Sequence, residues 1–453
     1  MREHLNIILI TVDSLRFDDF MAFAKKTLSL MLKSGQIFVN AVAAGPSTSP
    51  SILAMLTSEL PLEYGNYFFV SPRRISLASV LRIHGYKCLC LQTNYFLRRK
   101  FGWAKGFHIY EELFPSKPVL KRAIERLIRI GLLRSLLKIM DFTGRMTLRK
   151  PICRADEVFR EALKFVSKIE KPFFLWIHLM DVHAPFIPNE DSYKQFVGSV
   201  SYARVLNANL TWIYRPQELK REDINLLRAL YRAEIISLDE KLYQFLTRLL
   251  ELFKSSDLCI IVTADHGEEF WDHGGYNHEA KLYDELIHIP LLLMAPDLPS
   301  GIIIEEPVSL MDLAPTLASL ALKRKTAVPK WKGVNIVEIL EGEGLRPDGP
   351  GVLSEVAHRE PWKINIEALK VSARSKRWKV IYDAEKKSYE VYDLTSDPME
   401  LKNIGSKCLG DQELKTLRST VWKRVMSLRI RFKIRKRLGS LARAQVGRTS
   451  PCP

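Results

Sequence analysis

Residues 258–293 read LCIIVTADHGEEFWDHGGYNHEAKLYDELIHIPLLL, and this segment places ionisable side chains directly after an apolar run. The run 258–263 has the length and the β-branched content of a buried strand in a parallel sheet. It leads into Asp265 and His266, and His273 and His278 follow. A carboxylate beside an imidazole is a donor pair that suits Zn²⁺, Mn²⁺ or a similar cation. The segment therefore predicts a buried strand that ends at a metal or catalytic site.

Two other apolar runs end in the same way. NIILITVDSLR, residues 6–16, reaches Asp13 where its strand should stop. PFFLWIHLMDVHAPF, residues 172–186, reaches three polar residues in turn, His178, Asp181 and His183. Helical segments alternate with these strands, which predicts a three-layer α/β/α sandwich around a mostly parallel central sheet. Parallel strands end at one edge, where such sheets bind ligands. Asp13 by itself would equally fit a helix N-cap.

A helix is predicted to begin within GPSTSPSILAMLTSELP, residues 45–61. Pro50 suits a first helical turn, because its missing N–H has no intrahelical partner there. The free N–H groups of such a turn attract anions, so a hydroxyl at Thr48 or Ser49 could attack a bound oxyanion. Taken alone, simple capping of the helix by either hydroxyl is the better interpretation.

Length and composition exclude several classes of protein. The chain has 453 residues, 47% of them hydrophobic and 26% charged, which excludes wholesale disorder. Its six cysteines form no CxxC pair, so neither a disulfide framework nor a zinc finger is expected. No uncharged apolar run is long enough for a membrane span and the N-terminus does not read as a signal peptide, so we expect a cytoplasmic protein.

Two segments carry the net charge of +17. Residues 117–150 hold ten basic and two acidic residues, and residues 418–443 hold ten basic residues and no acidic one. Hydrophobic residues interleave with these charges, which is typical of basic amphipathic helices at an anionic membrane surface, although a solvated helical face is the common alternative. We do not expect nucleic acid as a partner, because no recognition motif accompanies the charge.

The order of these segments resembles the sulfatase family of the alkaline phosphatase superfamily. NIILITVDSLR resembles the opening strand of that family, and Thr48-Ser49-Pro50-Ser51 resembles its nucleophile motif Cys/Ser-x-Pro-x-Arg. ADHGEEFWDHG and LYDELIHIPLLL are similar to its metal and substrate segment, and residues 308–321 and 377–404 to its later blocks. We therefore expect a catalytic domain at 1–345 with 117–150 as a basic helical insertion, a small antiparallel α+β subdomain at 346–405, and a basic tail at 406–453.

The resemblance implies roles for individual residues. One divalent metal, Mn, Zn, Ca or Mg, would be bound by Asp13, Thr48, Asp265 and His266. Thr48 would be the nucleophile, with His183, His273 and His278 as further catalytic residues. His178, Asp181 and Lys281 would bind the substrate.

Three residues depart from the family pattern. Ser14 occupies a position where a second Asp is common in the family. Thr48 occupies the position of the Cys or Ser that is oxidised to formylglycine, and Ile52 occupies the position of the Arg of the motif. Thr48 is not expected to become formylglycine, and threonine resembles the phosphotransferase side of the superfamily.

The predicted function is a metal-dependent hydrolase of sulfate, phosphate or phosphonate esters, with an anionic ester as substrate. One alternative is a phosphotransferase that moves a phospho-group to a glycan or lipid alcohol. Another is a non-catalytic, membrane-associated binding protein of the same fold. We expect any membrane contact, through 117–150 and 418–443, to be peripheral and at the inner face. The oligomeric state is left open.

Overall fold

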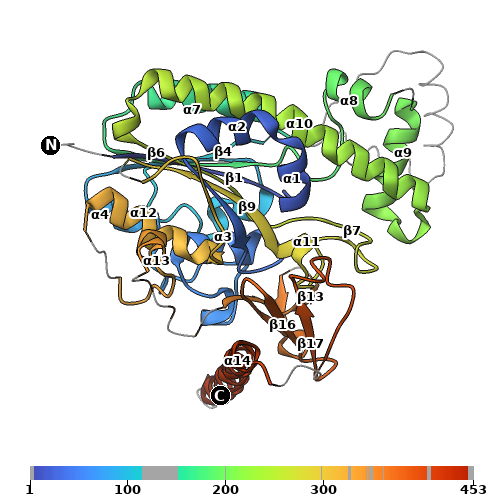
Figure 1. Cartoon of the computed structure of the whole chain (residues 1–453). Coiled ribbons are helices and arrows are strands. Elements are labelled where there is room, and N and C mark those ends of the chain that lie inside the picture. The colour runs from blue at the N-terminus through green and yellow to red at the C-terminus, as the bar shows by residue number, and fades with distance from the viewer. Residues whose placement is uncertain are drawn as a thin grey trace, which may run out of the picture.

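The computed structural model describes residues 5–114 and 152–446, apart from 199, 297, 325–327, 343, 345, 347, 348, 350, 361 and 406–409. Its centre is a nine-stranded sheet with the order β10-β2-β9-β6-β1-β5-β3-β4, in which β11 also pairs with β2 (Figure 1). The strands are β1 Asn6–Val12, β2 Gln36–Val42, β3 Lys87–Gln92, β4 Ile109–Glu112, β5 Phe173–Leu179, β6 Leu258–Ala264, β9 His288–Met294, β10 Ile302–Ile304 and β11 Val308–Ser309.

Helices cover both faces of this sheet (Figure 1). One layer contains α1 Phe17–Phe23, α2 Lys25–Ser34, α7 Ala155–Val166 and α10 Arg221–Leu252. The other contains α3 Thr48–Thr57, α4 Leu77–Ile83, α12 Leu313–Leu322 and α13 Ile336–Leu340. Beyond the end of the sheet, α8 Glu190–Phe196 and α9 Tyr202–Tyr214 pack near α10. The predicted three-layer sandwich is confirmed.

The central strands are buried on both faces, which explains why their sequences are continuous apolar runs. β1 pairs in parallel with both β5 and β6, and its Thr11 lies opposite His178 and Thr263. Only β9 runs antiparallel to its neighbours β2 and β6 among the described strands of this sheet. The parallel register brings the carboxyl ends of β1, β5 and β6 to one edge.

A second sheet of four antiparallel strands lies beside this edge. Its order is β12 Val352–Val356, β15 Lys370–Arg374, β16 Trp378–Asp383 and β17 Ser388–Asp393. The last helix, α14 Gln412–Val446, packs across β15 and β16 (Figure 1). It buries an apolar stripe composed of Leu414, Leu417, Val421, Val425 and Leu428.

The small sheet is joined to the loop that precedes α3. The Ser354 hydroxyl donates to the carbonyl of Ala43 at 2.6 Å, and the Glu355 N–H donates to that of Ala44 at 2.9 Å. The Glu355 carboxylate accepts hydrogen bonds from the N–H of Leu62 and from Arg424 of α14. Strand β12 therefore connects the loop before Thr48 to the last helix.

The structure can be compared with only part of the domain division that was predicted from the sequence. The predicted basic insertion at 117–150 lies outside the described residues. The first half of α14 shares its core with the small sheet, although the boundaries at 345/346 and 405/406 stay predictions. Among the described residues, no helix combines the length and apolar character needed to span a bilayer.

Candidate active site

Two buried aspartates form the centre of the site. Asp13 follows β1, Asp265 follows β6, and both side chains are fully buried. Ser14, in a left-handed conformation with φ of 59°, donates its N–H to Asp265 Oδ1 at 3.2 Å and its hydroxyl to Asp13 Oδ1 at 2.9 Å. Ser14 therefore connects the two carboxylates at the position where the family pattern has a second aspartate.

His178, at the end of β5, is directed at these carboxylates by its neighbours. Its Nδ1 lies 2.8 Å from the hydroxyl of Thr11, which also accepts a hydrogen bond from Trp176. Its Nε2 lies 3.3 Å from Asp13 Oδ2. Ligand atoms of Asp13, His178 and Asp265 all lie within 4.8 Å of one another. The sequence-based assignment of His178 was to substrate; the structure places it among candidate metal ligands.

His266 lies close to both carboxylates of this cluster. Its Nδ1 lies 2.8 Å from the carbonyl of Gly267, so it carries the proton and donates to that oxygen. Its Nε2 then has a free lone pair, 3.5 Å from Asp265 Oδ2 and 3.6 Å from Asp13 Oδ1. Burial, followed by the charge of His278, lowers the pKa of His266 to about 4. The imidazole is therefore neutral and able to bind a cation.

Thr48 lies at the first turn of α3, beside the same carboxylates. Its Oγ1 donates to Asp13 Oδ2 at 3.1 Å and lies 3.4 Å from His266 Nε2. The turn before it is tight, since a Cβ on Gly45 would lie 2.7 Å from Cβ of Pro50. The Thr48 hydroxyl is thus held where the helix presents free N–H groups and the positive end of its dipole.

Asn94 is a member of the cluster that the sequence interpretation missed. Its Nδ2 donates to Asp13 Oδ2 at 2.6 Å and lies 3.3 Å from Thr48 Oγ1. It follows β3, the neighbour of β5, just as Asp13 follows β1. The sequence 87–92 is a largely apolar run as well, so the rule applied to the other strand ends would have pointed to Asn94.

The charges of the two aspartates favour a bound cation. Burial would raise the pKa of Asp13, but a hydrogen bond from His178 and nearby histidines hold that pKa well below its usual range. Burial, followed by the charge of Asp13, raises the pKa of Asp265 well above its usual range. Asp265 Oδ2 is buried without a hydrogen-bond partner among the described residues. Two carboxylates and two imidazoles with such an orphaned oxygen fit a divalent metal ion.

Two further histidines flank the cluster. The ring of His278 lies 4.6 Å from that of His266 and 5.5 Å from that of His183, measured between centroids. Burial lowers the pKa of both His183 and His278. Glu268, which the sequence interpretation also missed, is fully buried with Oε1 3.4 Å from His278 Nδ1. Thus His278 lies next to His266 and His183 next to His278, and their predicted catalytic roles stay predictions.

His278 also lines a cavity of about 830 Å³ between this site and the small sheet. Lys370 and Asp383 of that sheet and Tyr283 form part of its wall. The C-terminal strands therefore border the approach to the site.

Three residues expected at the site have their polar groups bound elsewhere. His273 lies between Glu285 Oε1 at 2.8 Å and the carbonyl of Glu400 at 3.1 Å, and stacks on Tyr283. Lys281 forms an ion pair with the buried Glu269 at 2.8 Å. Asp181 accepts the N–H of Ala155 at the start of α7. The structure shows no contact of these three with Asp13 or Thr48, and their predicted roles stay predictions.

Comparison with known proteins agrees with this geometry. The sulfatase family model matches residues 5–323, and the model of the N-sulphoglucosamine sulphohydrolase C-terminal region matches residues 272–431. Arylsulfatase K of Bos taurus is 23% identical, covering 89% of this chain and 78% of its own length. Choline-sulfatase of Rhizobium meliloti (strain 1021) is 29% identical over 45% of this chain and 38% of its own.

Solved structures share the fold. The phosphonate monoester hydrolase of Agrobacterium radiobacter superposes with a TM-score of 0.70 at 21% identity, covering 94% of this chain and 96% of that one. The phosphonate monoester hydrolase of Silicibacter pomeroyi gives a TM-score of 0.68 at 18% identity, with 95% of each chain covered.

The fold and the matches define an ester hydrolase of the sulfatase class, whose members bind a divalent metal. Since the sulfatase model covers more than half of the sequence, the chain belongs to the sulfatase family.

Replacing Asp265 with Asn tests the metal site. We expect the metal-free variant to be at least as stable as the metal-free wild type, because the change removes repulsion between two buried carboxylates. Mn²⁺ or Ca²⁺ at a hundred times Kd should raise the free energy of unfolding of the wild type by about 2.7 kcal/mol, and its melting temperature should rise accordingly. The variant should show no such shift in a thermal unfolding assay. An equal metal-induced shift in both proteins would contradict the assignment.

The pH dependence of stability distinguishes a structural His273 from a catalytic one. Burial would lower the pKa of His273, but Glu285 raises it above the usual value of about 6.5. The resulting stabilisation is full below about pH 6.5 and is lost as the pH rises through the raised value. Urea unfolding should therefore show that His273→Gln destabilises more at pH 5.5 than at pH 9, and Glu285→Gln should do the same. Loss of turnover with unchanged stability at both pH values would instead support catalysis.

Proposed function

We propose that the chain hydrolyses phosphate, phosphonate or sulfate esters through a covalent ester on Thr48 Oγ1, formed beside one divalent cation. The observation that supports this is the position of that hydroxyl, 3.1 Å from Asp13 and 3.4 Å from His266 at a helix N-terminus. Asp13, His178, Asp265 and His266 would hold the cation. When bound, it supplies positive charge that acidifies the hydroxyl and withdraws charge from the ester.

The first step transfers the phosphoryl, phosphonyl or sulfuryl group of the ester to Thr48. The hydroxyl loses its proton to water, and Oγ1 forms a bond to phosphorus or sulfur. The bond to the leaving alcohol oxygen breaks, and that oxygen takes a proton from His183 or His278. The first turn of α3 offers N–H groups to the non-bridging oxygens. Water then attacks the Thr48 ester, releases the anion and returns a proton to the hydroxyl.

Two features support a plain hydroxyl nucleophile rather than formylglycine. Oxidation of Thr48 would give a ketone, because its Cβ carries a methyl group. Ile52, which replaces the arginine of the family motif, is fully buried in the core and offers no charge. Release of the anion then depends on attack by water, which favours phosphate and phosphonate esters over sulfate esters in this proposal.

Thr48→Ala and Thr48→Ser test the nucleophile. We expect kcat/KM on nitrophenyl phosphate, phenylphosphonate and sulfate esters to fall at least about 10³-fold in the alanine variant, because the group that accepts the anion is absent. Serine should retain activity to within about tenfold, since it keeps the hydroxyl. Full turnover by Thr48→Ala on all three esters would refute the mechanism.

Added glycerol or methanol distinguishes a hydrolase from a phosphotransferase. A transferase yields the new ester of the added alcohol, and a hydrolase yields the free anion.

We also propose that α14 binds an anionic membrane surface, the inner face if the protein is cytoplasmic as predicted. Exposed apolar residues recur at every fourth position of this helix: Trp422, Met426, Ile430, Ile434 and Leu438. Basic residues flank them, and no acidic residue lies in 418–443. An exposed apolar row between cations suits an interface of lipid headgroups and acyl chains.

Flotation with phosphatidylserine vesicles tests the membrane surface. The double variant Ile430→Glu/Ile434→Glu should lose most of its vesicle-bound fraction, because both substitutions place charge in the apolar row. Met399→Glu/Leu401→Glu is the matched control, since those side chains are 49% and 72% exposed outside α14. Equal flotation of the two double variants would remove the proposal.

A further inference from the structure

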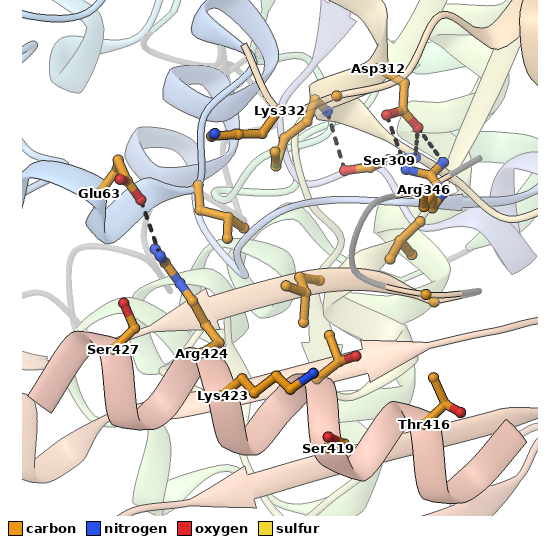
Figure 2. Close-up of a pocket in the computed structure, with 18 of the residues that line it drawn as sticks. Glu63, Ser309, Asp312, Lys332, Arg346, Thr416, Ser419, Lys423, Arg424 and Ser427 are labelled. Carbon is orange, nitrogen blue, oxygen red and sulfur yellow. Dashed lines mark hydrogen bonds and ion pairs between the residues drawn. The ribbon is translucent and has the colours of Figure 1, made fainter. Parts of the chain in front are cut away.

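A second cavity lies between α14 and the catalytic domain, away from Thr48. It measures about 830 Å³ and is open to solvent (Figure 2). One wall is the polar side of α14, which presents Thr416, Ser419 and Lys423, and the opposite wall includes Lys332 and Arg346 (Figure 2). The cavity shares no lining residue with the cluster around Asp13. Helix α3 separates them: Thr48 is at its start, and Leu60, beyond its end, lines the cavity.

Helix α14 explains why the cavity exists. Its apolar stripe is turned to β15 and β16, so a different side of the helix faces the catalytic domain. That side consists of hydroxyl and cationic side chains, which do not pack as a dry interface. The helix is nevertheless fixed here, because Arg424 binds Glu355 at 2.8 Å and Glu63 at 3.1 Å.

The charges of the cavity do not balance. Among the described residues, six cationic and two acidic side chains line it. Asp312 binds Arg346 at 2.5 Å, Glu63 binds Arg431, and Glu355 binds Arg424. Lys332, Lys415 and Lys423 are left, and in the described part of the chain no carboxylate lies within ion-pair distance of their ammonium groups. These three exposed lysines present positive charge to the cavity, which the charge of a bound anion would complement.

The remaining lining suits a saccharide. Ser419 and Ser427 offer hydroxyl groups for hydrogen bonds, and Leu60, Met311 and Val352 offer a small apolar surface. The volume is within the range of small-molecule sites, about 300–1,000 Å³, and is sufficient for a short oligosaccharide. Lysine ammonium groups bind sulfate and phosphate oxygens as point charges.

We propose that this cavity is a second binding site, distinct from the catalytic one, for a saccharide that carries sulfate or phosphate groups. Lys332, Lys415 and Lys423 bind the anionic groups, and the hydroxyl side chains of α14 bind the sugar. The site does not require chemistry at Thr48, so it stands even if the proposed nucleophile fails.

The test measures binding in a protein that cannot turn over. In the Thr48→Ala background, the triple variant Lys332→Gln/Lys415→Gln/Lys423→Gln is compared with Lys33→Gln/Lys168→Gln/Lys402→Gln, which removes the same charge from exposed lysines on other elements. The probe is a fluorescent sulfated tetrasaccharide, followed by anisotropy. We expect Kd to rise at least about tenfold in the cavity variant and less than about twofold in the control, because only the former loses direct contacts.

Further arms identify the ligand. Ser419→Trp should weaken binding by filling the cavity without changing its charge, and the desulfated tetrasaccharide should bind poorly. Ile430→Glu/Ile434→Glu, designed against vesicles, should leave Kd unchanged. Equal Kd values for the two lysine triples would overturn the proposal. So would full displacement of the probe by inorganic sulfate at the same sulfate concentration, which would indicate an unspecific anion site.

Discussion

The structure depends on two carboxylates that are held together in a buried position. Asp13 and Asp265 emerge from adjacent parallel strands, and the register of β1 with β6 leaves them no room to separate. Two such charges in a low-dielectric environment repel each other strongly unless a proton or a cation lies between them. The repulsion between the carboxylates is reduced, and their oxygens are oriented, by the surrounding donors Ser14, Asn94 and His178. The fold therefore creates a buried site whose ligand atoms fit a divalent cation.

Much of the fold could be predicted from sequence, because its strands are continuous apolar runs. Residues buried on both faces, as in β1, β5 and β6, leave a pattern that does not depend on distant partners. The short strands β10 and β11 were not predicted, since two or three residues give no periodic pattern. The small antiparallel sheet of the C-terminal region was correctly predicted, because alternating side chains reveal a half-buried strand.

The site was predictable where polar residues follow strands and unpredictable where contacts are set by tertiary packing. Asp13, Thr48, Asp265 and His266 were predicted to meet, and in the structure they lie together. His273 belongs to the same histidine-rich segment, but a tight turn carries its ring to Glu285 and Tyr283. Sequence spacing alone does not reveal such a turn. Similarly, α14 reads as a basic amphipathic tail, whereas the partner of its apolar stripe becomes visible only once β15 and β16 are placed.

The hydrogen bonds of β12 to the carbonyls of Ala43 and Ala44 have a mechanical consequence. They join the C-terminal sheet to the loop before Thr48, and Glu355 extends this connection to α14 through Arg424. Strand β12 thus supports the loop that leads into α3. If a ligand or a force shifts the last helix, strand β12 would pass that displacement on to the loop before Thr48.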